Sequence, residues 1–153
     1  IKPRTPNYLN DKKRTSALIS LCSLLNALLP EAQPNKKIYQ LFETFVENIN
    51  LDNWIYLYIF FEINLIKELG FDTNLKTYNI NSEKDELFKK IELDNFKYDV
   101  PIFLIKEEIP TTNNENTVKK SLFFTRSILL NKFFLPNSVN FPKSRIIFEN
   151  YFN

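Results

Sequence analysis

Apolar side chains recur at spacings of three and four residues in several stretches of the chain, as they do in a helix that buries one face. The first stretch covers residues 16–29, and Pro30 is expected to end this helix because proline cannot continue it. The second stretch begins after Asn35, a residue type that caps helices, and its apolar positions extend to Ile49. The pattern predicts two amphipathic helices in the first third of the chain.

A third stretch, residues 53–69, is apolar over most of the helix circumference rather than along one stripe. Asp52 is a candidate N-cap, and Gly70 supplies the left-handed residue that commonly follows a helix. A helix that is apolar nearly all round has to be surrounded by protein. We therefore expect this helix to be the central and most buried one.

The helical spacing is lost between residues 71 and 112. Segments such as residues 98–105 favour strand-like or irregular structure around Pro101, and Pro110 follows shortly after. The expected fold class is therefore mainly α, a helical bundle with a small irregular or β-like excursion at about residues 71–112.

Beyond a polar loop, the helical spacing returns from Val118 to about Phe134. Pro142 suits the first turn of a last helix, where its missing N–H is not needed. The apolar residues expected in that helix are Ile146, Ile147 and Phe148.

The composition argues against an enzyme. The 153 residues contain no histidine, a single glycine and a single cysteine, Cys22. Histidine is the usual acid–base group and metal ligand at neutral pH, and phosphate-binding loops need several glycines. We therefore expect no catalytic residues, no cofactor and no metal site. The absence of a long apolar run also predicts a cytoplasmic protein with no membrane contact.

The charge is distributed unevenly although the net charge is only +2. Residues 1–14 sum to +4 and residues 117–153 sum to +5, so the middle of the chain is acidic. If the two ends meet in space, they form a basic face suited to phosphate or to an acidic peptide. The alternative is an ordinary solvated surface in a lysine-rich chain.

Three segments resemble, in order, the C-terminal domain of the RecO family. Residues 24–39, LLNALLPEAQPNKKIY, are similar to the family's LLxxLLPExxPxxxLY pattern, and residues 61–71, FEINLIKELGF, to its FExxLLxELGF segment. Residues 122–145 resemble the family's ending, which closes on LPxxR. In some members the excursion carries four zinc-binding cysteines; Tyr78 stands at the first of these positions, so the resemblance implies no metal here.

The resemblance implies a recombinational DNA repair mediator that helps recombinase load onto single-stranded DNA coated with SSB and anneals strands without enzymatic turnover. The implied partners are the acidic, Phe-ended C-terminal tail of SSB, RecR, and single- and double-stranded DNA. The implied location is the bacterial cytoplasm, in association with the nucleoid. Residues 1–14 are expected to be a linker from a missing N-terminal OB domain, and residues 15–153 the helical domain.

Basic residues in two regions are candidates for binding. Arg145 matches the terminal arginine of the family pattern, and a basic rim around an apolar groove for the SSB tail is expected from Arg126, Lys132, Lys143 and Arg145. The alternative for Arg145 is a structural pair with an acid of an adjacent helix. The candidates for contacts with DNA phosphates are Lys12, Lys13 and Arg14; alternatively, these three are simply solvated.

Other residues are expected to be structural. The helical spacing of Trp54, Tyr58 and Phe61 favours core packing over stacking on bases. Glu62, on a mostly apolar helix, is expected to be the buried partner of a basic side chain, and Cys22 a small core residue. The rival function is a generic helical interaction scaffold without a nucleic-acid role, favoured if the basic residues lie far apart on different faces.

Overall fold

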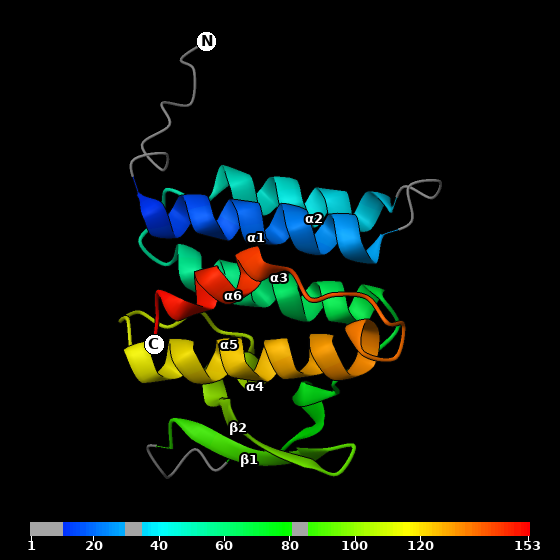
Figure 1. The fold of residues 1–153 in the computed structure, drawn as a ribbon. Coiled ribbons are helices and arrows are strands. Elements are labelled where there is room, and N and C mark those ends of the chain that lie inside the picture. The colour runs from blue at the N-terminus through cyan, green and yellow to red at the C-terminus, as the bar shows by residue number, and fades with distance from the viewer. Residues whose placement is uncertain (1–10, 30–34, 81–85) are drawn as a thin grey trace.

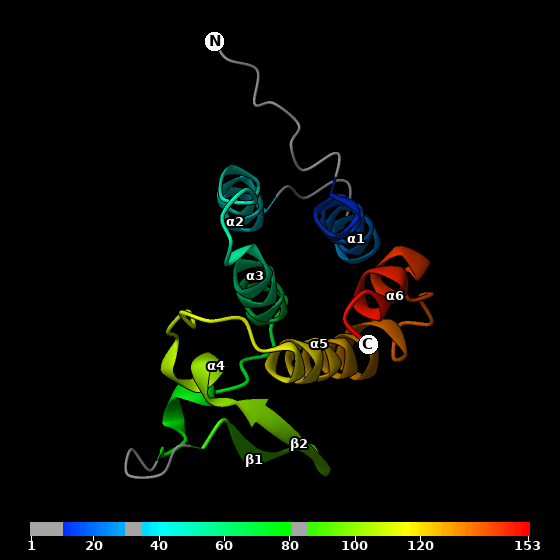
Figure 2. The same ribbon diagram turned by 90° about the vertical axis from the view of Figure 1, so that its left-hand side faces the viewer.

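The structure is a computed structural model that describes residues 11–29, 35–80 and 86–153, and it is built mainly from helices (Figure 1). Five helices form the body of the molecule: α1 (Lys12–Leu28), α2 (Lys36–Glu47), α3 (Trp54–Glu68), α5 (Glu115–Leu129) and α6 (Lys143–Asn150). Seen end-on, they surround a common interior, with α1 beside α6 and α3 between α2 and α5 (Figure 2). The expected helical bundle is confirmed.

The excursion lies along one side of the bundle, on the side of α5 that faces away from α1 and α2 (Figures 1 and 2). It contains a short 3-10 turn (Leu75–Thr77), β1 (Phe88–Leu93), β2 (Phe96–Pro101) and α4 (Ile102–Lys106). The expectation of a small β-like interruption is therefore confirmed. One detail differs: of residues 98–105, expected to be strand-like or irregular, those up to Pro101 form a strand, and residues 102–105 are helical, with Phe103 and Leu104 buried.

The hairpin is closed by a two-residue turn in which Asp94 and Asn95 both have positive φ, 48° and 71°. Such turns match the twist of paired strands and favour asparagine and aspartate. On the outward face the register places Lys90 opposite Asp99 and Glu92 opposite Lys97. Opposite charges therefore face each other across the strands, while the inner face packs against α5.

Helix α1 begins at Lys12, four residues earlier than the apolar pattern indicates. Asp11 is its N-cap and accepts hydrogen bonds from the backbone N–H groups of Lys13 and Arg14. The Arg14 guanidinium pairs with the Asp11 carboxylate and donates to the carbonyl of Ile49 at 2.7 Å. Residues 12–14, expected in a linker, thus belong to the first helical turn; residues 1–10 and Pro30 lie outside the described residues.

Replacing Asp11 with alanine is expected to lower the free energy of unfolding by about 1 kcal/mol, or the midpoint of thermal unfolding by about 2–4 °C. Partial burial alone would raise the pKa of Asp11, but hydrogen bonds from Arg14 and Lys13 outweigh it and hold the pKa below 3.8. Because the pKa of Asp11 is lower in the folded than in the unfolded chain, its stabilisation is fully present above the unfolded-state pKa. It is lost as the pH falls through the folded-state pKa.

The control is Asn35→Ala, because Asn35 caps α2 through a hydrogen bond from the backbone N–H of Ile38 but cannot ionise. Thermal unfolding at pH 7 and near pH 3 checks both variants. The loss caused by Asp11→Ala should shrink at the lower pH while that of Asn35→Ala persists; equal losses of Asp11→Ala at both pH values would contradict the assignment.

Helix α3 is the central helix, as expected, and its buried residues lie all around it: Trp54, Ile55, Tyr56, Tyr58, Ile59, Phe61, Glu62, Leu65 and Ile66. Its N-cap is Asn53 rather than the expected Asp52. Gly70, with φ +108°, ends it as expected. The N–H of Gly70 donates to the Lys67 carbonyl and that of Phe71 to the Ile66 carbonyl, the two bonds of a Schellman motif.

The last part of the chain turns back across the bundle. Helix α5 continues into a π-helical turn (Leu130–Phe134), and α6 then lies against α1. Ile146, Ile147 and Phe148 all lie in this helix, as expected. Phe148 is completely buried, whereas Ile146 and Ile147 are 44% and 56% exposed. Within the described residues, no helix is long and apolar enough to cross a membrane.

Candidate functional site

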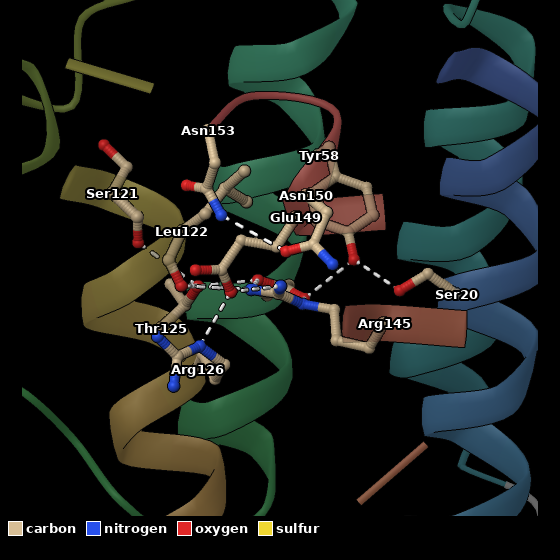
Figure 3. A network of polar contacts seen from close by, with 11 residues as sticks. Ser20, Tyr58, Ser121, Leu122, Thr125, Arg126, Arg145, Glu149, Asn150 and Asn153 are labelled. Atoms are coloured by element: carbon tan, nitrogen blue, oxygen red, sulfur yellow. Dashed lines mark hydrogen bonds and ion pairs between the residues drawn. The ribbon is translucent and has the colours of Figure 1, made fainter. Parts of the chain in front are cut away.

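A cluster of ionised and hydroxyl side chains lies inside the bundle where α1, α3, α5 and α6 meet (Figure 3). At its centre is Arg145 of α6, whose side chain is completely buried. Its Nε donates to Oε2 of Glu62 at 2.7 Å, and its Nη2 donates to Oε1 of the same carboxylate at 3.0 Å. This two-point pairing is the strong geometry for a guanidinium and a carboxylate.

The remaining hydrogen-bonding capacity of the pair is used by neighbouring groups. Nη2 of Arg145 also donates to the Leu122 carbonyl at 3.1 Å, and the hydroxyl of Thr125 donates to Glu62 at 2.6 Å. Tyr58 donates to Glu62 at 2.8 Å, so its other contact, with Ser20 at 2.8 Å, is one in which the serine donates. The cluster therefore ties four helices to one carboxylate.

Glu149 extends the cluster to the surface. Its Oε1 accepts from Nη1 of Arg145 at 2.9 Å and from Nε of Arg126 at 2.8 Å. Two arginines thus face two glutamates, Glu62 and Glu149, and the charge inside the bundle is balanced. A buried charge is tolerated only when it is paired and hydrogen-bonded in this way.

The ionisation of the buried groups follows from these contacts. Burial raises the pKa of the Tyr58 phenol well above its usual value, and the Glu62 carboxylate raises it further. Burial alone would lower the pKa of Arg145, but the Glu62 carboxylate outweighs this and raises it above its usual value. Tyr58 is therefore neutral and Arg145 charged across the physiological range, which suits a structural cluster.

The placement of Arg145 corrects the expected rim. Its guanidinium is completely buried and so cannot contact a peptide at the surface. It pairs instead with Glu62 of α3, which is the structural alternative. The buried-partner role expected for Glu62 is confirmed. Trp54, Tyr58 and Phe61 are core residues, as expected. Cys22, expected in the core, is exposed instead.

The other three residues of the expected rim do not lie together. Arg126 turns toward α6 and pairs with Glu149. Lys132 turns the other way, toward the excursion, where it pairs with Asp94 and lies over the ring of Phe71. Lys143 is exposed in the first turn of α6. The structure thus does not join Arg126, Lys132, Lys143 and Arg145 into one rim.

The basic residues at the start of α1 have separate roles. Arg14 is bound to Asp11 and to the carbonyls of Ile49 and Leu51, so it fixes the turn between α2 and α3. Lys13 lies over the ring of Phe152, 5.2 Å from its centre. Lys12 is exposed and lines a groove. Of the three phosphate candidates, Arg14 is the one whose guanidinium is bound to other parts of the fold.

That groove, of about 310 Å³, lies between α1 and α6. Its apolar lining includes Ile19, Ile147 and Tyr151, which are 54%, 56% and 40% exposed. Helices α1 and α6 run antiparallel (Figure 1). Lys12 lines the groove. Lys143 does not line it but lies one helical turn before Ile147, next to Ser144 in the chain. The buried hydroxyl of Ser144 lines the groove and has no hydrogen-bond partner among the described residues.

The sequence pattern did not indicate that these residues form a groove. In α6 the buried Arg145, Phe148 and Glu149 share one face, while Ile147 and Tyr151, four residues apart, lie on another. The sequence feature that could have revealed the groove is a second apolar face on the short helix α6. It was overlooked because consecutive isoleucines suggest burial rather than a helix exposing two different sides.

Comparisons with known proteins point to one family. The family model for the "Recombination protein O C terminal" region matches residues 9–143. A DNA repair protein RecO of Ehrlichia chaffeensis is 29% identical over 89 residues, which are 57% of this chain and 36% of that protein. One from Rhodospirillum centenum is 33% identical over 63 residues, covering 41% of this chain and 25% of that protein.

A DNA repair protein RecO from a Wolbachia of Drosophila simulans is 28% identical over 83 residues, which are 53% of this chain and 35% of that protein. The chain therefore spans a quarter to about a third of the length of the curated relatives it matches. No solved structure matches the chain.

Proposed function

This chain belongs to the family of the recombination protein O C-terminal region, and on that premise we propose that it is the protein-binding helical domain of a recombinational DNA repair mediator. Its relatives are named DNA repair protein RecO. The domain acts by binding rather than by catalysis. The acids at its centre support this, because Glu62 and Glu149 are both engaged by arginines inside the bundle.

The observation that carries the proposal is the groove between α1 and α6. Its floor is apolar, Lys12 lines it, and so does the buried hydroxyl of Ser144, which has no partner among the described residues. Lys143 lies beside Ser144 at the exposed start of α6. An acidic peptide that ends in an aromatic residue matches this surface, because its ring fills the apolar part and its carboxylates meet the lysines. We assign this groove to the SSB tail, with Lys12 and Lys143 in place of the rim expected from the sequence.

The proposed cellular role is that of the family. In the cell the domain works at the bacterial nucleoid, with RecR and with single- and double-stranded DNA, and it helps recombinase load onto DNA that SSB covers. Lys12 and Lys13, both exposed in the first turn of α1, are the phosphate contacts of this domain. Arg14 supports them by fixing that turn to the carbonyls of Ile49 and Leu51.

Fluorescence anisotropy of a labelled SSB tail peptide, titrated with the chain at two salt concentrations, tests the groove. Ile147→Ala removes apolar surface from its floor and is expected to weaken binding about five- to tenfold. Lys12→Glu replaces an attractive charge with a repulsive one, so it is expected to weaken binding at least as much at low salt and less at high salt.

Each variant has a matched control. Ile146→Ala changes an isoleucine of the same helix that does not line the groove, and Lys36→Glu makes the same charge change at the start of α2. Both controls should bind the tail as the parent chain does. A folded chain that binds neither the tail peptide nor DNA at low salt would count against the proposal as a whole.

A generic helical interaction scaffold without a nucleic-acid role is the second candidate. The observation in its favour is that the basic residues expected to act together are separated. Arg145 is buried, and Lys132 contacts the hairpin, which lies on the far side of α5 from α1, the helix that begins with Lys12 (Figure 2). Tail binding that is independent of Lys12, together with no measurable DNA binding, would favour this candidate.

A further inference from the structure

The exposed face of α5 carries an aromatic ring next to a guanidinium. Phe123 is 50% exposed, although Leu122 and Phe124 on either side of it in the sequence are completely buried. The guanidinium carbon of Arg126 lies over the Phe123 ring, 5.2 Å from its centre. The guanidinium therefore stacks on one face of the ring, and both flat groups remain partly exposed to solvent.

Arg126 is held in this position by Glu149 of α6. Its Nε donates to Glu149 at 2.8 Å, and Glu149, which is 6% exposed, is itself fixed by Arg145 at 2.9 Å. The side chain of Arg126 still remains 30% exposed. A guanidinium that is anchored at one edge and open on the other side loses little conformational freedom when a ligand stacks on it.

The charge around the ring is positive. Lys119 lies one helical turn before Phe123 and is exposed, so cations lie on both sides of the ring along the helix. The nearest acid of the exposed helix face is Glu115, a turn further away at the helix start. A flat aromatic surface between cations fits a ligand that has both flat rings and phosphates.

We propose that Phe123 and Arg126 form a platform on which a base of single-stranded nucleic acid stacks, with Lys119 contacting a neighbouring phosphate. This inference rests on the DNA binding proposed above and adds a second surface to it, separate from the groove and from Lys12 and Lys13. Bases in a duplex are already stacked on one another, so the platform favours single strands. It reads no sequence, because every base has a flat face.

The test compares a labelled oligothymidylate with an abasic oligomer of the same length, which carries the phosphates without the bases. By anisotropy at low salt, the parent chain is expected to bind the oligothymidylate about five- to tenfold more tightly than the abasic oligomer. Phe123→Leu should bring both affinities to the abasic level. Phe96→Leu makes the same change at an equally exposed ring, 52%, in the hairpin, and should leave the difference intact.

Arg126→Lys keeps the charge but removes the flat guanidinium, so it should also reduce the difference between the two oligomers. Thermal unfolding confirms that each variant is folded. A folded Phe123→Leu chain that still prefers the oligothymidylate, or a parent chain that binds both oligomers equally, overturns the platform while DNA binding stands. A parent chain that binds neither oligomer overturns both the platform and the proposed DNA binding.

Discussion

Replacing Arg145 with alanine is expected to lower the free energy of unfolding by about 3–5 kcal/mol, because removing one partner of a buried pair leaves the other charge without compensation. Glu62 is completely buried and would lose both bonds from the guanidinium. The loss is a large fraction of the roughly 5–15 kcal/mol by which domains of this kind are stable. Urea denaturation followed by the fluorescence of Trp54 measures it.

The double variant Glu62→Leu with Arg145→Met separates the lost charge balance from lost packing. Replacing both partners of a buried pair with apolar residues is often neutral or stabilising by about 1–4 kcal/mol. We expect the double variant to recover most of the stability lost in Arg145→Ala, while Glu149 keeps its bond to Arg126. A double variant as unstable as Arg145→Ala would mean that the ion pair is not what holds α6 in place.

Replacing Phe148 with alanine is expected to cost about 3–5 kcal/mol, since it leaves a cavity in the core. The ring is completely buried and lies 4.4 Å from that of Tyr58 and 6.2 Å from that of Trp54, measured between centroids. It is the apolar anchor of α6, so its loss should also weaken tail binding by loosening one wall of the groove. Thermal unfolding with and without the tail peptide measures both effects.

The comparison is with Ile147→Ala, one residue away on the same helix. Ile147 is 56% exposed, so this change is expected to alter the free energy of unfolding by no more than about 0.5 kcal/mol. Ile147→Ala should therefore weaken tail binding with little loss of stability, whereas Phe148→Ala should lower both. Equal destabilisation by both would contradict the assignment of Phe148 to the core face of α6.

The helices were predictable because their periodicity is local. The spacing of apolar residues placed α2 and α3 within a few residues of their observed ends, and Asn35 and Gly70 marked two of those ends. The start of α1 was missed because Asp11 caps a first turn of charged residues that carries no apolar signal. Cys22 was misplaced because it lies only 100° around the helix from buried Leu21, at the edge of the stripe.

The site was harder to predict because its contacts are distant in sequence. The sequence indicated that Glu62 needs a basic partner, since its helix is apolar, but the partner lies 83 residues away. An arginine in a polar-looking final segment gives no local sign of burial. The sequence therefore leaves two alternatives open for Arg145, and its complete burial against Glu62 of α3 decides between them.

The exposed features were missed for a related reason. Ile147 and Phe123 are apolar residues in amphipathic helices, and apolar positions in such helices are expected to be buried. Whether a given apolar side chain is covered depends on which neighbouring helix lies over it, which the sequence of one helix does not contain.

The most direct test of the proposed function is to map the SSB tail peptide onto the isotopically labelled chain by NMR chemical-shift perturbation. Amide shifts should concentrate at the groove, around Lys12, Ile19, Ser144, Ile147 and Tyr151, and the Ile147→Ala variant should reduce them at equal peptide concentration. Shifts concentrated on the hairpin or α2, or none at peptide concentrations that saturate a micromolar site, would contradict the assignment of this groove to a mediator's partner.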